Sequence, residues 1–221
     1  MEDEVLNVFD DKGSCTGVAT RADVHTYGYW HEVFHCWFIS RESNADYVYI
    51  QLRSDSKKDY PGLFDITAAG HLLANETVED GVREIKEELG VTLRFDQLNA
   101  LGIITYTNVV ENFIDKEMAN VFLYCSSLDF EDFTLQEEEV AGIVKVTFQD
   151  FFDLWVGDRE QIHMEGFTVK EKKKKWIEGN IGTNHFVPHQ TMFYQSVAER
   201  IKNYISFIDV KRGERLGYQK R

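Results

Sequence analysis

The chain has 221 residues, of which 43% are hydrophobic and 28% are charged, so it can form one domain with a full core and an extension. No apolar run approaches the roughly 18 residues of a membrane-spanning helix, and the acidic start MEDEVLNVFDD is unlike a secretory signal, which predicts a cytoplasmic protein. The formal net charge of −14 argues against general binding to nucleic acid, because an acidic protein repels polyanions.

Alternating patterns and short apolar runs predict strands before and after one strong helix. The predicted strands lie at about 4–9, 15–20, 31–39, 46–53, 100–110, 117–126 and 140–147. In residues 31–39 both alternating faces are largely apolar, as in a central strand that is covered on both sides. Helical spacing predicts helices from near Val78 to Leu89, at 148–156 and at 189–209. The simplest architecture is a mixed sheet between helices.

The last part of the chain differs from the rest in charge. Residues 155–221 carry 13 Lys and Arg against 8 Asp and Glu, whereas the preceding residues are strongly acidic. We expect a domain at 1–154 and a helical extension at 155–221 that packs on the same domain. The basic run Lys172–Lys175 is typical of a solvated helix face, and the alternative is a patch that attracts a phosphate substrate or nucleic acid.

Three carboxylates of the predicted helix at 78–89 share one side of it. Glu84, Glu87 and Glu88 have i, i+3, i+4 spacing, at which like charges destabilise a helix by a few tenths of a kcal/mol per pair. Carboxylate oxygens that converge in this way are the ligands that a hard divalent ion such as magnesium prefers. The alternative is a solvated acidic face. The apolar residues of the same helix follow a period of about 3.6 residues and should face a core: Val78, Val82, Ile85 and Leu89.

The residues around these acids form a longer motif. From Arg83 the chain reads REIKEELGV, and this stretch is preceded by Gly70, five residues and then Glu76. The pattern resembles the signature of the Nudix family, R-E-U-x-E-E-x-G-U, in which U is aliphatic. Only six residues separate Glu76 from Arg83, against seven in the family, which weakens the expectation that these two side chains are in contact. Thr77 and Asp80 resemble a capping box, so the acids downstream keep their register.

The resemblance implies the Nudix fold, an α/β/α sandwich with a mixed sheet and a loop-helix-loop Nudix box, to which a C-terminal helical extension is added. Three further segments resemble the isopentenyl-diphosphate isomerase-like branch of the family. They are LRSDSKKDYPGLFDITAAGH at 52–71, FTLQEEEVAGIVKV at 133–146 and, more loosely, HFVPHQTMFYQSVAERI at 185–201. The resemblance covers roughly residues 3–205.

Nudix relatives hydrolyse a diphosphate that is linked to another group, X, with the help of magnesium or manganese ions. The resemblance implies a set of metal ligands that consists of Glu84, Glu87, Glu88 and the backbone carbonyl of Gly70. It also implies that Glu84 is one of the catalytic carboxylates, and that Glu76 and Arg83 are supporting residues of the box.

A general base must also lie near the attacking water. In similar proteins the acid just before an aliphatic residue, at the start of a strand, points at the metal. In Gln136–Val140 this acid is Glu139, our first choice, and Glu138 is the second. The alternative is that both belong to a charged turn.

A second metal site is implied by the isomerase-like branch, whose type I enzymes hold a divalent metal with histidines and later acids. At matching places this chain has His25, His31, His71, Asp115 and Glu117. Neutral imidazoles and carboxylates are ligands of zinc, manganese or iron. The spacing of His25 and His31 is one residue shorter than in the isomerases, and the alternative is that the histidines are structural.

The isomerase reaction itself is disfavoured. It needs a cysteine two residues before the histidine that matches His71, and this chain has Ala69, which cannot transfer a proton. The leading hypothesis is a metal-dependent hydrolase of a small-molecule diphosphate, either nucleoside-derived or isoprenoid-like. The alternative is a ligand-sensing Nudix domain whose basic C-terminal part contacts DNA or a protein. We expect no membrane partner, and the sequence leaves a homodimer open.

Overall fold

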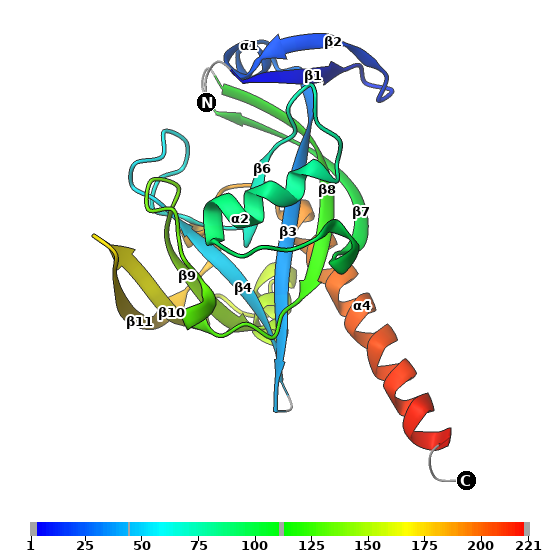
Figure 1. Ribbon diagram of the computed structural model, residues 1–221, viewed down its shortest axis with the longest axis vertical. Helices are drawn as coiled ribbons and strands as arrows, with labels where there is room; N and C mark the ends of the chain where they lie inside the picture. Colours follow the sequence, from blue (N-terminus) through cyan, green and yellow to red (C-terminus); the bar gives the residue numbers. More distant parts are fainter. Residues whose placement is uncertain (1–3, 44, 111–112, 219–221) are drawn as a thin grey trace.

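The computed structural model describes residues 4–43, 45–110 and 113–218, the last seven of them as helix backbone only. Within these residues eleven strands form one sheet (Figure 1). The strands are β1 (Val5–Phe9), β2 (Cys15–Thr20), β3 (Trp30–Glu42), β4 (Ala45–Arg53), β5 (Phe64–Asp65), β6 (Ala68–His71), β7 (Asn99–Val110), β8 (Phe113–Cys125), β9 (Val140–Thr147), β10 (Ile162–Lys170) and β11 (Lys173–Ile181). The helices are α1 (Arg21–Tyr27), α2 (Arg83–Leu89), α3 (Phe148–Val156) and α4 (Thr191–Tyr218).

The sheet is mixed, as the sequence predicts. Its main path runs β11-β10-β9-β4-β3-β1-β2, and β8 joins β3 in parallel while β7 pairs with β8. The central strands β3 and β4 pair with each other only at residues 38–42 and 45–49. Beyond that point they diverge, because β6 takes over the pairing with β3 and β5 the pairing with β4 (Figure 1). The sheet therefore splits between its two central strands.

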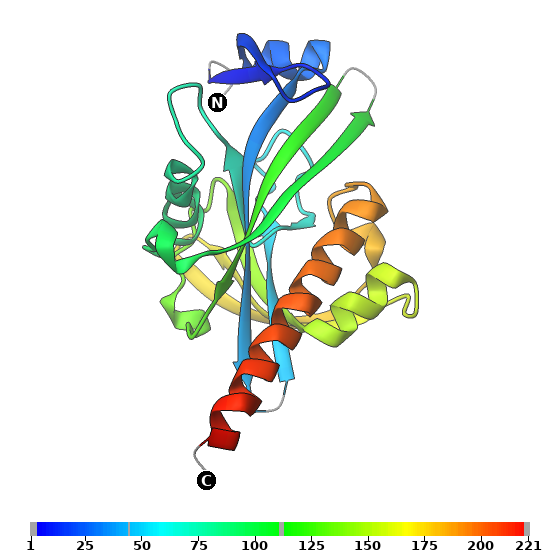
Figure 2. The same ribbon diagram turned by 90° about the vertical axis from the view of Figure 1, so that its right-hand side faces the viewer.

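Helices cover both faces of the sheet, with α2 on one face and α3 and α4 on the other (Figure 2). Alternate residues of β3 supply the two cores, since successive side chains of a strand point to opposite faces. Phe34 and Phe38 belong to the core beneath α2, and Val33 and Trp37 to the core beneath α3 and α4. The α/β/α sandwich of the Nudix fold is confirmed.

The segment before α2 begins with a short turn of 3-10 helix, η1 (Asp80–Val82). The backbone N–H and the hydroxyl of Thr77 both donate to the Asp80 carboxylate, at 2.8 Å each, which is one half of the predicted capping box. The other half does not form, because the Asp80 N–H donates to the Thr77 carbonyl, at 3.1 Å, instead of the hydroxyl. The structure explains Gly81 as well. A Cβ atom at this position would lie 2.6 Å from the Phe34 ring, so glycine allows η1 to approach β3 closely.

The extension at 155–221 differs from the prediction, because it contains strands besides its helix. The strands β10 and β11 form a hairpin, and β10 pairs with β9 and so continues the sheet. The run Lys172–Lys175 consequently lies at the turn and start of β11 rather than on a helix face. Glu171 and Lys172 form the turn with positive φ values of 52° and 59°, a conformation that usually signals itself in the sequence by Asn or Gly. Here the Glu137 carboxylate accepts hydrogen bonds from both backbone N–H groups, at 2.8 and 2.7 Å.

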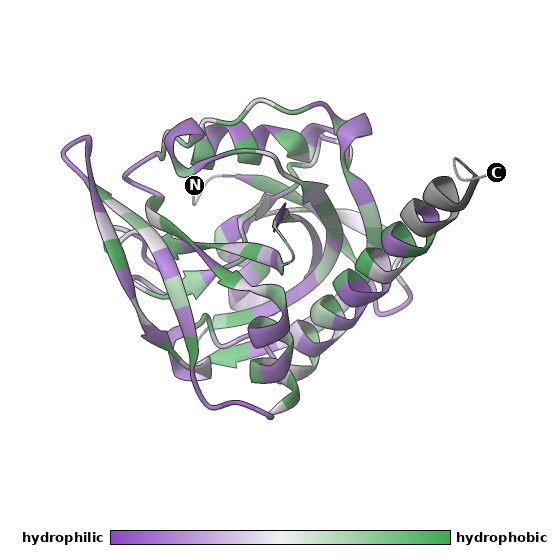
Figure 3. Ribbon diagram, turned by 90° about the horizontal axis from the view of Figure 1, so that it is seen from below, coloured by the Kyte–Doolittle hydropathy of each residue, from purple (hydrophilic) through white to green (hydrophobic). Residues whose placement is uncertain are grey.

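The predicted helix at 189–209 is present as α4, which begins at Thr191, is described to Tyr218 and mixes hydrophilic and hydrophobic residues in the part coloured in Figure 3. Its first half packs Phe193, Val197 and Ile201 into the core shared with α3. In the part of the chain that the structure describes, no helix combines the length and the apolar character needed to cross a membrane.

Candidate functional site

A cavity of about 260 Å³ lies where the two central strands diverge. Side chains reach it from both faces of the sheet. Glutamates of α2 line it from one side, and His189, which precedes α4, lines it from the other. The segment that fills the split, from the end of β4 to β6, supplies further lining residues. They include Lys57, Asp65, Ala69, Gly70 and His71.

The three carboxylates of the motif all line this cavity, but their surroundings differ. Glu88 is only 4% exposed and accepts hydrogen bonds from the Ala69 backbone N–H at 3.0 Å and from the Gln51 side chain at 3.3 Å. One Arg83 nitrogen donates to Glu84 at 2.6 Å and to the exposed Glu87 at 3.1 Å. The three are therefore spread along the cavity wall, and they are not among the described sets of three donors whose atoms lie within 4.8 Å of one another.

Glycine at position 70 makes room for one of these acids. A Cβ atom on Gly70 would lie 2.2 Å from the Glu84 carboxylate, so any other residue would displace it. Burial raises the pKa of Glu84 to about 7, and burial together with the charge of Glu84 raises the pKa of Glu88 to about 8. The wall of the cavity thus holds carboxylates whose negative charge is costly, which is the condition that a bound cation relieves.

The contact between Glu76 and Arg83 forms in spite of the shorter spacing. The Arg83 guanidinium donates to both Glu76 oxygens, at 2.6 and 3.0 Å, and to the His71 carbonyl at 3.1 Å. The 3-10 turn η1 rises more per residue than an α-helix does, which helps six residues to span the gap. Arg83 thereby ties the loop that carries His71 to α2.

The two candidates for the general base lie in different places. Glu139 lines the cavity and forms an ion pair with Lys57. Glu138 is exposed and does not line the cavity.

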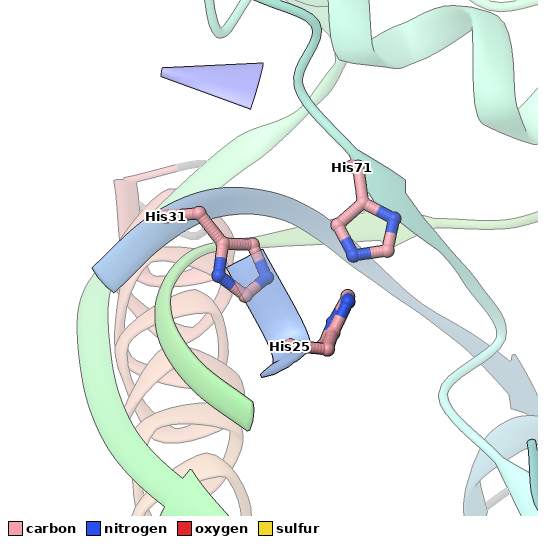
Figure 4. Close-up of side chains that lie close together, drawn as sticks. All are labelled: His25, His31 and His71. Carbon is pink, nitrogen blue, oxygen red and sulfur yellow. The ribbon is translucent and has the colours of Figure 1, made fainter. Parts of the chain in front are cut away.

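The predicted histidine cluster comes together at the same cavity. His25 from α1, His31 from β3 and His71 from β6 point toward one another (Figure 4), with ligand atoms within 4.8 Å of one another. His31 forms a second such set with Asp115 and Glu117 of β8. The nitrogen Nε2 of His25 lies 3.5 Å, and that of His31 3.6 Å, from one oxygen of Asp115.

Hydrogen bonds orient two of these rings. The Nδ1 atom of His25 lies 2.9 Å from the Arg21 carbonyl, and the Nδ1 atom of His31 lies 3.2 Å from the Tyr29 carbonyl. A carbonyl accepts only, so in each ring Nδ1 donates and Nε2 is left to face the cluster, the ring orientation found in metal-bound histidines. Burial lowers the pKa of His31 to about 4, so its ring is neutral at pH 7.

Several atoms of the cluster are left without hydrogen bonds. Within the described residues the buried Nε2 atoms of His31 and His71 and one oxygen of Asp115 have no such partner. Buried polar atoms are nearly always satisfied, so three orphans at one point indicate a missing ligand. Neutral imidazoles and carboxylates suit zinc, manganese or iron, and the donor set fits such an ion.

One group of four cavity residues, His35, Asp65, Tyr106 and His189, was not predicted as part of the site. His35 on β3 lies with Nε2 3.5 Å from the Glu117 carboxylate, which also accepts a hydrogen bond from the Tyr106 hydroxyl. His189 lies with Nε2 3.4 Å from the Asp65 carboxylate. His35 could have been found from the sequence, because it follows His31 by four residues and so lies on the same face of the strand. His189 could not, because only the tertiary structure brings it close to Asp65.

Comparisons with known proteins identify the family of this chain. A family model described as the NUDIX domain matches residues 29–164. An uncharacterized Nudix hydrolase from Clostridium acetobutylicum is 34% identical over 198 residues, which cover 89% of this chain and 96% of that protein. An isopentenyl-diphosphate Delta-isomerase from Corynebacterium diphtheriae is 34% identical over 91 residues, which cover 40% of this chain and 48% of the isomerase.

A solved structure is similar as well. The crystal structure of a protein from Deinococcus radiodurans has a TM-score of 0.53, covers 70% of this chain and 90% of that one, and is 18% identical. At this identity the likeness concerns the fold alone.

Replacing Glu76 by Gln should destabilise the protein by about 1 kcal/mol at pH 7, since one charged partner of a two-point hydrogen bond is lost. The hydrogen bond from Arg83 lowers the pKa of Glu76 below its usual 4.5, so this stabilisation is present above pH 4.5 and is lost as the pH falls through the lower value. Urea unfolding across this pH range, with Glu79→Gln as an exposed control, measures the difference. A difference between wild type and Glu76→Gln that persisted unchanged in acid would contradict the assignment.

Proposed function

Since this chain belongs to the Nudix family, we propose that it is a metal-dependent hydrolase that cleaves the diphosphate linkage of a small organic diphosphate. The observation that carries the proposal is the convergence of α2 and of the segment before β9 on one cavity. The cavity is lined by Glu84, Glu87, Glu88 and Glu139. Burial raises the pKa of two of them, Glu84 and Glu88.

Glu84, Glu87, Glu88 and the carbonyl oxygen of Gly70 would hold magnesium or manganese. Hard oxygen donors spread along a wall suit Mg²⁺, which usually keeps several waters and takes few protein ligands. When bound, such ions neutralise charge on the diphosphate and lower the pKa of the attacking water. The protein residues then have to position that water and accept its proton.

Glu139 is the proposed general base. Its carboxylate lines the cavity, and the ion pair with Lys57 holds the side chain there. Its backbone carbonyl also accepts a hydrogen bond from Ser54 at 2.9 Å, which fixes the turn against the end of β4. Both contacts orient the group that would take the proton from water.

Hydrolysis fits this cavity better than isomerisation does. Ala69 lines the cavity, and its methyl group cannot donate or accept a proton. Its backbone N–H serves Glu88 instead, so this position supports the carboxylate wall.

We also propose that His25, His31, His71, Asp115 and Glu117 bind one divalent ion of zinc, manganese or iron. The fit rests on the orphaned Nε2 atoms of His31 and His71 and on the two rings whose Nδ1 atoms donate to carbonyls. This site lies beside the carboxylate wall, since His71 directly follows Gly70. A metal there would help to hold the segment between β4 and α2.

A screen of small diphosphates with magnesium or manganese tests the proposed function. We expect metal-dependent release of phosphate from at least one compound, and a loss of about 100-fold or more in kcat for Glu88→Gln. Glu79→Gln, which changes an exposed acid outside the cavity, should keep the wild-type rate. Equal turnover by Glu88→Gln and wild type would remove α2 from the active site.

The general base is tested by the matched pair Glu139→Gln and Glu138→Gln. The first should lower kcat by about 100-fold or more, because a general base typically contributes that much, and the second should stay within about twofold of wild type. Rates are measured at saturating metal with the substrate found in the screen. Similar losses in both variants would point to the charge of the turn rather than to one base.

Metal analysis of the purified protein tests the histidine cluster. We expect tightly bound zinc, manganese or iron, and at least tenfold weaker retention in His71→Asn because one ligand is lost. His163→Asn, an exposed change on β10, should bind like the wild type. Wild-type protein that contains none of these metals after incubation with them would leave the cluster as a structural feature.

A further inference from the structure

Two histidines at the cavity serve neither proposed metal site. His35 and His189 both line the cavity, on the α4 side of the sheet, and they are not in a described set of three close donors. Their ring centroids are 6.5 Å apart, and the Tyr106 ring lies 6.4 Å from the first and 5.0 Å from the second. This group lies across the sheet from the carboxylates of α2.

In each of the two rings, Nε2 lies close to a carboxylate. His35 faces the Glu117 carboxylate through Nε2, and His189 faces the Asp65 carboxylate through Nε2. Asp65 is itself fixed, because Arg53 donates to it at 2.8 Å and the Ile66 backbone N–H donates at 2.9 Å. The orientation of His189 is thus set by Asp65, which is not one of the residues proposed to bind metal.

The other nitrogen of each ring has no hydrogen bond. Nδ1 of His35 and Nδ1 of His189 are buried and lack a partner among the described residues. Burial of an unpaired polar atom is unfavourable, so a core histidine would normally be satisfied. Two such atoms beside one cavity are suited to a ligand with polar atoms of its own.

The position of the pair defines which part of a substrate it would meet. A diphosphate held by Glu84 and Glu88 would occupy the α2 side, and the same cavity is lined by His35 and His189 on the other side. The group X of such a substrate would then lie toward the two imidazoles. A hydroxyl group can both donate and accept, so it pairs with either tautomer of each ring.

We propose that His35 and His189 recognise hydroxyl groups of X, so that the substrate is a diphosphate of a sugar-like or otherwise hydroxylated group rather than of a plain prenyl chain. This proposal rests on the proposed hydrolase function. Asp65 is a positioning residue in it, and His189 is the residue that determines specificity. The extension at 155–221 then takes part in substrate choice, because His189 stands at the start of α4.

Two matched substrate pairs test the proposal. They are ADP with its 2′,3′-dideoxy analogue, and dimethylallyl diphosphate with the derivative that carries a terminal hydroxyl group. We expect wild-type protein to prefer the hydroxylated member at least about tenfold in kcat/KM, because a site built for a hydroxyl rejects the analogue that lacks it. In His189→Phe the ratio should fall to near one, mainly through KM, and His189→Gln should keep part of the preference. His163→Phe on the exposed face of β10 serves as the control and should keep the wild-type ratio.

The result that overturns the proposal is an unchanged ratio in a folded His189→Phe variant, or equal use of both members of each pair by wild type. If wild type releases phosphate from none of the four compounds, the proposed function fails on these substrates, and calorimetric binding of the same pairs decides the specificity question separately. A binding preference that His189→Phe abolishes supports the site, and no preference rejects it.

Discussion

The burial of two carboxylates is the constraint around which this structure is organised. Glu84 and Glu88 lie side by side in the wall of one cavity, where burial raises the pKa of each. Such a wall forms only if the backbone around it is rigid. Gly70 leaves space for Glu84, Gly81 lets the start of the helical segment approach Phe34, and Arg83 fastens the loop by two hydrogen bonds to Glu76.

The split between the two central strands determines what the wall can act on. If β3 and β4 paired along their whole length, the faces of the sheet would be separated by backbone. Instead they part, and one cavity is lined by α2 residues on one side and by His35 and His189 on the other. The same split admits β6, which brings His71 beside His25 and His31. The groups proposed to bind metal and those proposed to recognise X thus line one cavity.

Much of this could be predicted from the sequence because the signals are local. The i, i+3, i+4 spacing placed the acids on one side of α2, and long apolar or alternating runs located most of the long strands. The hairpin β10–β11 was missed because its turn, Glu171–Lys172, carries no Asn or Gly and depends on the distant Glu137. The short strand β6, with the sequence AAGH, lacks the β-branched residues that mark strands, and it forms because β3 offers an unpaired edge.

Some residues of the candidate site could likewise be predicted from the sequence, and others could not. The Nudix box and the histidine cluster follow from motif and resemblance, and the cavity is lined by most of their residues, with Glu76 and His31 as exceptions. The pairing of His189 with Asp65 joins residues 124 positions apart in the chain and has no local signature. His35 sits in an apolar strand, where a histidine is easily taken for part of the core.

The hydrogen bonds from the β10–β11 turn to Glu137 connect the tip of this hairpin to the cavity. The Glu137 carboxylate accepts hydrogen bonds from the backbone N–H groups of Glu171 and Lys172, and Glu139, two residues later, lines the cavity. The hairpin tip lies beyond the segment that matches the family model, residues 29–164. A longer or differently folded tip would therefore displace Glu137 and, through the turn, Glu139, the proposed general base, although the tip itself lies outside the matched range.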